Sequence, residues 1–178
     1  MNTENDMRSK IFGLGLSRTG TTTLNDTLIE LGYNVVHYPS EDELWGFHTD
    51  GATDIPVIPV YKELDKKFPN SKFIITIRDK KDWLDSIVPY LERKRGWNMA
   101  QRQVDIRTRV YGSPFPNRKQ AEAAYEAHDT DVMNYFRNRK QDLLILDIIG
   151  GDSTKLLTDF LGVDPIDPVF KHKNKLKK

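Results

Sequence analysis

A glycine-bracketed loop near the N-terminus constrains the fold of this chain more than any other segment. The loop, Gly15-Leu16-Ser17-Arg18-Thr19-Gly20, follows an apolar run at 11–14 and precedes a stretch of helical periodicity that begins near Thr21. When a strand, a loop and a helix follow in this order, N–H groups of the loop and of the first helical turn converge on one point. The helix dipole adds positive potential there. The segment therefore predicts an anion-binding cradle in an α/β fold.

The spacing of the two glycines matches a nucleotide-binding P-loop, G-x-x-x-x-G-K-[ST], with one departure. Thr21 occupies the position of the lysine, so we do not expect an ordinary ATP or GTP site. Arg18 contributes a planar guanidinium suited to a tetrahedral oxyanion. Thr21, Thr22 and Thr23 contribute hydroxyl groups at the start of the helix. The alternative is a tight turn in which the glycines serve backbone geometry alone.

Composition limits the classes of partner. The 178 residues include 27 basic and 26 acidic side chains, for a net charge of +1. A general nucleic-acid binder is more basic, so we expect no nucleic-acid partner and a local anion site. The chain has no cysteine, which excludes disulfides, thiolate metal sites and cysteine nucleophiles. The polar N-terminus and the lack of a long apolar run predict neither a signal peptide nor a membrane span, and hence a cytoplasmic protein of open oligomeric state.

Short apolar segments alternate with amphipathic ones, which predicts parallel β-α units with right-handed crossovers. We expect a three-layer, P-loop-type α/β fold with a mainly parallel sheet of about four to five strands flanked by helices. One domain is expected over 10–170, preceded by a disordered lead-in at 1–9 and followed by a basic tail at 171–178. The expected strands are 10–16, 34–38, 73–77 and 143–149, and the expected helices are 21–31, 59–68, 80–94, 119–139 and 154–161. Residues 39–56 are expected to be loop-like, and 95–118 to consist of helix fragments and loop.

A second anion site is expected where the strand at 73–77 ends. Arg78 follows this strand directly, and Ser86 lies eight residues later in the next helix. Ligands of parallel sheets bind beyond the carboxyl ends of the strands, where the glycine loop and Arg78 both fall. The guanidinium and the hydroxyl can meet at one phosphate if the helix folds back beside the strand, with Trp83 packed under the helix or against a base. The alternative is an ordinary surface ion pair of Arg78 with a neighbouring aspartate.

Together these residues resemble a known family. The segment Ser17-Arg18-Thr19-Gly20-Thr21-Thr22 looks like the 5′-phosphosulfate loop of sulfotransferases that use 3′-phosphoadenosine 5′-phosphosulfate (PAPS). The stretch from Arg78 to Ser86 resembles the family's 3′-phosphate motif, an arginine at a strand end followed by a serine one helix segment later. Further similarity covers nearly the whole chain and is strongest to the short, P-loop sulfotransferase-like branch of small-molecule and uncharacterised members. It runs through 125–128, 135–136, 143–147 and 160–162.

The resemblance implies a sulfotransferase that moves the sulfuryl group of PAPS to a hydroxyl or amine by in-line transfer, releases 3′-phosphoadenosine 5′-phosphate (PAP), and needs no metal. Arg18 would replace the lysine of the family's loop and stabilise charge on the bridging oxygen. The acceptor is expected to be a small molecule or a glycan. The residues implied in cofactor binding are Ser17, Arg18, Thr19, Gly20, Thr21, Thr22 and Thr23 in the loop, with Arg78, Trp83 and Ser86 at the second site.

Sulfuryl transfer benefits from a general base beside the acceptor oxygen. In related enzymes this base is a histidine or carboxylate after the second strand, which leaves His37, His48, Asp50 and Asp54 as candidates. We place Asp54 first, because it precedes a predicted helix, and His37 second, because it ends a predicted strand. Alternatively, Asp54 is a helix N-cap and His37 an ordinary edge residue.

Two other functions stay open at this level. One is a non-catalytic PAPS- or PAP-binding module, and the other, less favoured, is a small P-loop kinase with Asp147 as its Mg²⁺ ligand. The acceptor pocket is expected to be shaped by 39–58 and 95–118. The latter segment carries Arg102, Arg107 and Arg109, which suit either an acidic substrate or the 3′-phosphate of the cofactor.

Overall fold

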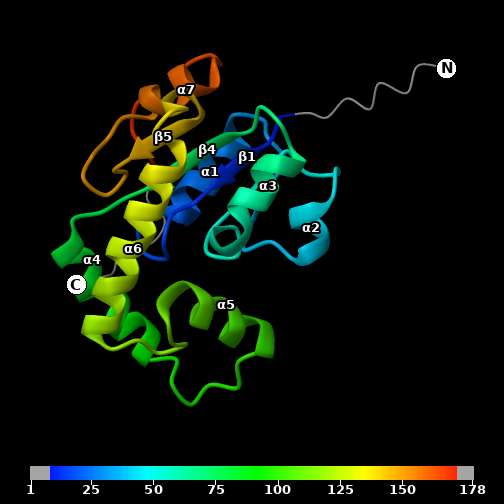
Figure 1. Ribbon diagram of the computed structural model, residues 1–178. Helices are drawn as coiled ribbons and strands as arrows, with labels where there is room; N and C mark the ends of the chain where they lie inside the picture. The colour runs from blue at the N-terminus through cyan, green and yellow to red at the C-terminus, as the bar shows by residue number, and fades with distance from the viewer. Residues whose placement is uncertain (1–8, 172–178) are drawn as a thin grey trace.

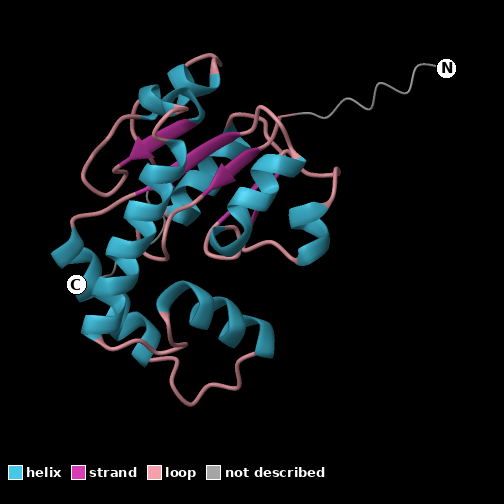
Figure 2. Ribbon diagram, viewed as in Figure 1, coloured by secondary structure: helices cyan, strands magenta, loops and turns pink. Residues whose placement is uncertain are grey.

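The computed structural model describes residues 9–171, so the predicted lead-in and basic tail lie almost entirely outside the described residues. Within this part of the chain five strands form one parallel sheet in the order β2-β3-β1-β4-β5. Helices cover both faces of the sheet (Figures 1 and 2). The predicted α/β fold is confirmed. The strands are β1 (Ile11–Gly13), β2 (Val35–His37), β3 (Gly51–Thr53), β4 (Lys72–Thr76) and β5 (Leu143–Leu146).

The helices largely follow the predicted pattern, although several ends differ by a few residues. The α-helices are α1 (Thr21–Glu30), α2 (Glu41–Trp45), α3 (Tyr61–Lys67), α4 (Lys80–Glu92), α5 (Gln101–Tyr111), α6 (Arg118–Phe136) and α7 (Thr154–Leu161). Two 3₁₀ turns, η1 (Ile58–Val60) and η2 (Lys140–Asp142), precede α3 and β5.

The two faces of the sheet bury separate clusters, because successive side chains of a strand point to opposite faces. Phe12 and Phe73 pack with side chains of α3 and α6 on one face. Their neighbours Ile11 and Ile74 pack with side chains of α1 and α7 on the other face. Strands buried on both faces read as continuous apolar runs, which is why β4 is evident in the sequence.

A third buried cluster joins α4, α5 and the start of α6. Trp83, Ile87 and Tyr111 are fully buried in this cluster, together with Leu16 from the glycine loop. Figure 1 shows α4, α5 and one end of α6 gathered at one end of the molecule. This cluster ties the α4–α6 end of the molecule to the loop that follows β1.

The prediction of a loop over 39–56 was wrong, because this segment contains α2 and β3. β3 is only three residues long and includes a glycine and an alanine, neither of which favours strands, so the pattern gave no signal. Gly51 is required by the close approach of β1, since a Cβ at this position would lie 1.9 Å from the carbonyl oxygen of Ile11. β3 inserts between β1 and β2, and its end carries Asp54 to the carboxyl edge of the sheet.

Candidate active site

The glycine loop is fixed in shape by contacts with β4. A Cβ at Gly15 would lie 1.8 Å from Oγ1 of Thr76, so only glycine allows the loop to approach this strand. The hydroxyl of Thr19 donates to the carbonyl of Leu16 at 2.7 Å and shares a 2.6 Å hydrogen bond with Thr76. Thr19 is fully buried, so its hydroxyl shapes the loop instead of facing a ligand.

Two aromatic side chains fix the glycine loop through hydrogen bonds with its backbone. The indole Nε1 of Trp83 donates to the carbonyl of Ser17 at 2.9 Å, and the amide of Ser17 donates to the hydroxyl of Tyr111 at 3.1 Å. Trp83 is fully buried and packs against Tyr125, with 5.0 Å between the ring centroids. Of the two positions predicted for Trp83, the structure shows the one under the helix, and the buried ring is closed to a stacking base.

The first turn of α1 presents free amide groups. Gly20 occupies the N-cap position with φ of 107° and provides no side-chain cap. Among the described residues the amides of Thr21, Thr22 and Thr23 meet no acceptor. Such N–H groups, aligned with the helix dipole, form an anion site. The hydroxyl of Thr22 lies at the same turn and is partly exposed.

Arg18, Arg78 and Ser86 converge beside this turn. Nε of Arg18 donates to Oγ of Ser86 at 3.1 Å, and Nη1 of Arg78 donates to the carbonyl of Arg18 at 3.3 Å. Nε of Arg78 is buried without a hydrogen-bond partner. Burial lowers the pKa of Arg18, and the charges of Arg78 and Arg93 lower it further. Arginine remains charged under such shifts. The guanidinium groups of Arg18 and Arg78 therefore concentrate positive charge at this place, which a bound anion would balance.

The ion pair considered for Arg78 is not formed within residues 9–171. Asp79 instead caps α4 by accepting the amide of Asp82 at 3.0 Å. Arg18 also differs from its predicted orientation, because its guanidinium lies at Ser86 and 5.2 Å from the ring centre of Tyr90. In the structure it belongs to the second anion cluster as much as to the loop.

His37 and Asp54, the two leading candidates for a general base, lie together at the loop. Nε2 of His37 is 3.4 Å from Oδ2 of Asp54 and 3.3 Å from the hydroxyl of Thr22. Its Nδ1 lies 3.1 Å from Oγ1 of Thr53, whose hydroxyl donates to Oδ1 of Asn25 at 3.1 Å. Because the Thr53 proton is directed to Asn25, Thr53 accepts from Nδ1–H of His37. Nε2 then faces Asp54 and Thr22.

Asp54 is buried at the end of β3, and burial raises the pKa of its carboxyl group. The charge of His37 and, to a smaller extent, the amide of Ile55 and the hydroxyls of Thr21 and Ser17 act in the opposite direction. The alternative role of Asp54 as a helix N-cap was wrong, because the N-cap of η1 is Val57 and no side chain caps this turn. A carboxylate with a raised pKa beside an anion site has the character of a general base.

A family model described as a sulfotransferase domain matches residues 10–42 and 40–178, nearly the whole chain. The chain belongs to the sulfotransferase family. Among solved structures, it superposes on the sulfotransferase of Alicyclobacillus acidocaldarius with a TM-score of 0.59, at 13% identity, over 94% of this chain and 87% of the other. It superposes on mouse sulfotransferase SULT7A1 complexed with PAP with a TM-score of 0.50, at 18% identity, over 94% and 67%. At these sequence identities the two superpositions show that the fold is shared and no more. No curated protein sequence matches the chain.

Backbone strain in this sulfotransferase gathers at the site. Of the four non-glycine residues with positive φ in the described chain, three belong to it: Arg18 at 76°, Tyr38 at 58° and Asp54 at 84°. The fourth, Asn70, lies in a turn before β4. Such conformations cost on the order of 1–3 kcal/mol each and cluster where a structure must hold functional groups in place.

The other candidates from the sequence lie away from this site or have carboxylates that accept other hydrogen bonds. Asp50 precedes β3, so the length of this strand, about 10 Å, separates it from Asp54. Its carboxylate accepts the amide of Asn34 at 2.8 Å. His48 precedes the same strand and is exposed. Oδ1 of Asp147 accepts the amide of Gly150 at 2.7 Å, so this carboxylate closes its own turn after β5.

Sequence reasoning missed the residues that support the site. Thr53 and Asn25 escaped notice because β3 was not predicted and because a buried polar partner leaves no pattern in a single sequence. The sequence suggests Tyr111 only as an aromatic side chain for the acceptor, whereas the structure buries it and its hydroxyl accepts the amide of Ser17. His128 of α6 hydrogen-bonds through Nε2 to the carbonyl of Leu14 at 2.7 Å, and burial lowers its pKa.

No group of three or more histidine, aspartate or glutamate side chains within residues 9–171 is arranged to hold a metal ion. Nor does any helix in this part of the chain combine the length and apolar character needed to cross a membrane.

Proposed function

We propose that this sulfotransferase takes the sulfuryl group from PAPS and transfers it to a hydroxyl or amine of a small acceptor, with Asp54 as the general base. The observation that supports the donor most is the presence of two adjacent anion sites with separate donors. PAPS has a phosphosulfate on one side of its ribose and a phosphate on the other, so it requires two such sites. A nucleoside triphosphate carries its phosphates in one chain and leaves the second site without a purpose.

The residues present fit this nucleotide. The open amides at the start of α1, with the hydroxyl of Thr22, would hold the 5′-phosphosulfate. Arg78 and Ser86 would hold the 3′-phosphate, where the orphaned Nε of Arg78 gains an acceptor. Arg18 belongs to the glycine loop and its guanidinium reaches Ser86, so it would lend charge to both sites. When bound, PAPS supplies an activated sulfuryl group. The solved mouse sulfotransferase with PAP supports this choice of nucleotide.

Asp54 and His37 would handle the proton of the acceptor. Burial raises the pKa of Asp54, so its carboxylate takes up a proton more readily than an exposed one. His37, fixed by Thr53 and Asn25, lies between Asp54 and Thr22. This arrangement orients the carboxylate beside the anion site and spreads the charge that appears when the acceptor loses its proton. Positioned donors such as Arg18 then stabilise the charge that leaves with PAP, an effect worth about 3–4 kcal/mol per donor in comparable sites.

Thermal unfolding with added nucleotide tests the donor. A specific ligand at about 100 times its dissociation constant stabilises the folded state by roughly 2.7 kcal/mol. We expect a clear rise in Tm with PAP, little change with ADP or ATP, and no requirement for Mg²⁺. A preference for ATP with Mg²⁺ would exclude PAPS as the donor.

A turnover measurement separates catalysis from binding alone. PAPS is incubated with the protein and a panel of hydroxyl and amine acceptors, and release of PAP is followed over time. Acceptor-dependent release of PAP by the wild type, reduced in Asp54→Asn, supports catalysis. Tight PAP binding without any such release supports the non-catalytic module instead.

A further inference from the structure

Helix α5 carries a buried arginine that the proposed donor site does not use. Arg107 is only 7% exposed. Within residues 9–171 it forms no ion pair, and its one hydrogen bond runs from Nη1 to Sδ of Met99 at 3.1 Å. A thioether is a weak acceptor, so the guanidinium keeps most of its hydrogen-bonding capacity unused. Burying a charge without a partner is costly, so a protein retains one where a ligand supplies the opposite charge.

Arg102, on the same helix, is under-satisfied in a similar way. Its Nη2 donates to the carbonyl of Pro39, and its guanidinium lies 5.5 Å from the ring centre of Tyr38. Its Nε is buried and has no hydrogen-bond partner. Among the described residues it forms no ion pair either, although Glu43 lies near enough to feel its charge.

Both arginines act electrostatically on tyrosines that also sense the proposed base. Burial raises the pKa of Tyr38, Arg102 and Arg107 act to lower it, and Asp54 acts to raise it. Burial also raises the pKa of Tyr111. The charge of Asp54 raises this pKa further, and the charge of Arg107 lowers it. Arg107 is therefore within electrostatic reach of two tyrosines that also sense Asp54. The positive φ of Tyr38 shows that this corner is held in a strained conformation.

We propose that the acceptor carries an anionic group, such as a carboxylate, a sulfate or a phosphate, that Arg107 and Arg102 bind while its nucleophile lies at Asp54. This inference rests on the proposed function, because it assigns the acceptor of the same site. The 3′-phosphate is the other anion in the reaction, but Arg18, Arg78 and Ser86 already provide its site. A neutral acceptor would leave Arg107 buried without a counter-charge, and such a site discriminates strongly against a ligand that lacks the matching group.

Calorimetric titration with matched acid and amide probes tests the proposal. The protein saturated with PAP is titrated with 4-hydroxybenzoate and 4-hydroxybenzamide, and then with lactate and lactamide. PAP occupies the nucleotide site, so the probes report on the acceptor side. We expect at least one acid to bind about tenfold or more tightly than its amide. Arg107→Met should abolish this preference and Arg102→Met should reduce it. The control Arg109→Met lies on the same helix but is exposed, and it should keep the preference.

The outcomes distinguish this proposal from the choice of donor. If neither acid binds better than its amide, or if Arg107→Met keeps the preference, the anionic acceptor is wrong even where PAP binds well. If PAP fails to bind, the same titrations without PAP decide the acceptor alone, and only the proposed donor is lost. An unchanged PAP affinity shows that the variant is folded, and Arg107→Gln replaces Arg107→Met if the latter does not fold.

Discussion

His37 and Asp54 lie at the ends of different strands, yet Nε2 of one is 3.4 Å from Oδ2 of the other. The register of the sheet produces this contact. His37 pairs with Thr53 across β2 and β3, and Asp54 follows one residue later. Because the strands are parallel, both side chains reach the same edge, where the first turn of α1 brings the hydroxyl of Thr22 to 3.3 Å from Nε2 of His37. The contact joins the proposed base to the proposed anion site.

Asp54→Asn should reduce the rate of transfer without weakening nucleotide binding. An amide cannot accept the proton of the acceptor, so we expect kcat to fall by about 10²–10⁴. Release of PAP from PAPS with an acceptor measures the rate, and calorimetry measures the affinity for PAP. Asp50→Asn, at the opposite end of β3, is the matched control and should keep the wild-type rate. Full activity of Asp54→Asn would remove Asp54 from the mechanism.

The same substitution should stabilise the protein at neutral pH. Burial raises the pKa of Asp54 in the folded state above its value of about 3.9 in the unfolded chain. The stability contributed by the protonated carboxyl is therefore complete below about pH 3.9 and is lost as the pH rises through the folded-state pKa. The amide that replaces the carboxyl group does not titrate, so the Tm of the variant should exceed that of the wild type at pH 7. Thermal unfolding from pH 4 to 8 should show this gap closing toward low pH, and a constant gap would contradict the assignment.

Thr53→Val should lower kcat while leaving the KM for PAPS unchanged. The change keeps the shape of the side chain but removes the hydroxyl that accepts from His37 and donates to Asn25. We expect a loss of about tenfold, equal to about 1.4 kcal/mol. Thr53→Ser should restore the rate. Thr49→Val is the control, because this buried hydroxyl bonds to Glu43 away from the site. An equal effect at both positions would reduce Thr53 to a structural residue.

The sequence predicted the elements whose signal is local. β4 contains the apolar run Phe73-Ile74-Ile75, and the glycine loop is defined by its spacing, so the α/β fold, the strand–loop–helix order at the loop and the placement of Arg78 followed from pattern alone. β3 could not be predicted, because Gly51 and Ala52 carry no strand signal and their pairing depends on β1 and β2. With β3 missing, the partners of His37 could not be inferred. The hydrogen bonds of Trp83 and Tyr111 with Ser17 depend on how α4 and α5 pack, which no local pattern encodes.

Arg78→Ala should remove the selectivity for the 3′-phosphate. PAP and AMP differ only by this phosphate, so their affinity ratio isolates its contribution. Loss of a charged hydrogen bond of about 1.5–3 kcal/mol should weaken PAP by roughly 10–100-fold and leave AMP nearly unchanged. Calorimetry with both nucleotides measures the ratio. Lys81→Ala, an exposed cation on α4 that pairs with Asp85, is the control. A ratio that survives in Arg78→Ala would show that the 3′-phosphate lies elsewhere.

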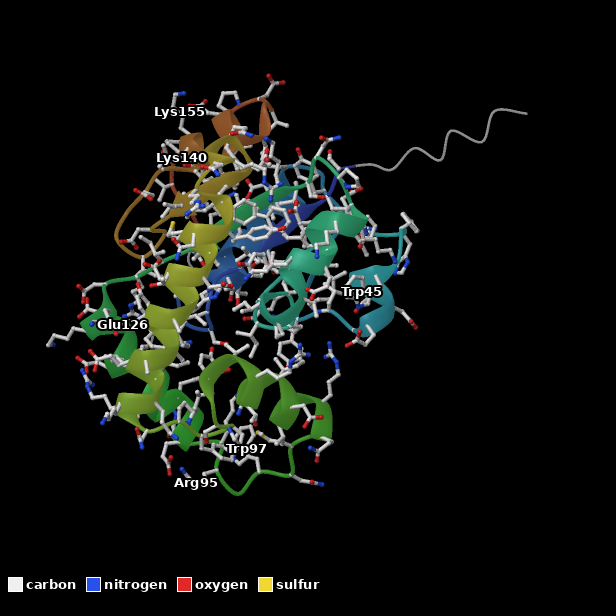
Figure 3. The ribbon with its side chains drawn as sticks, in the orientation of Figure 1. Trp45, Arg95, Trp97, Glu126, Lys140 and Lys155 are labelled. Atoms are coloured by element: carbon white, nitrogen blue, oxygen red, sulfur yellow. The ribbon has the colours of Figure 1, made fainter. Side chains whose placement is uncertain are left out.

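Trp83→Phe should weaken PAP binding through the shape of the loop. Phenylalanine still fills much of the buried space but cannot donate to the carbonyl of Ser17, a bond of 2.9 Å. The lost hydrogen bond is worth about 0.5–1.5 kcal/mol, so we expect PAP affinity to fall by about two- to tenfold, with a lower Tm. Trp97→Phe, on the exposed loop between α4 and α5 (Figure 3), should change neither quantity. If Trp83→Phe lowers only the Tm, the indole stabilises the fold but does not position the loop for its ligand.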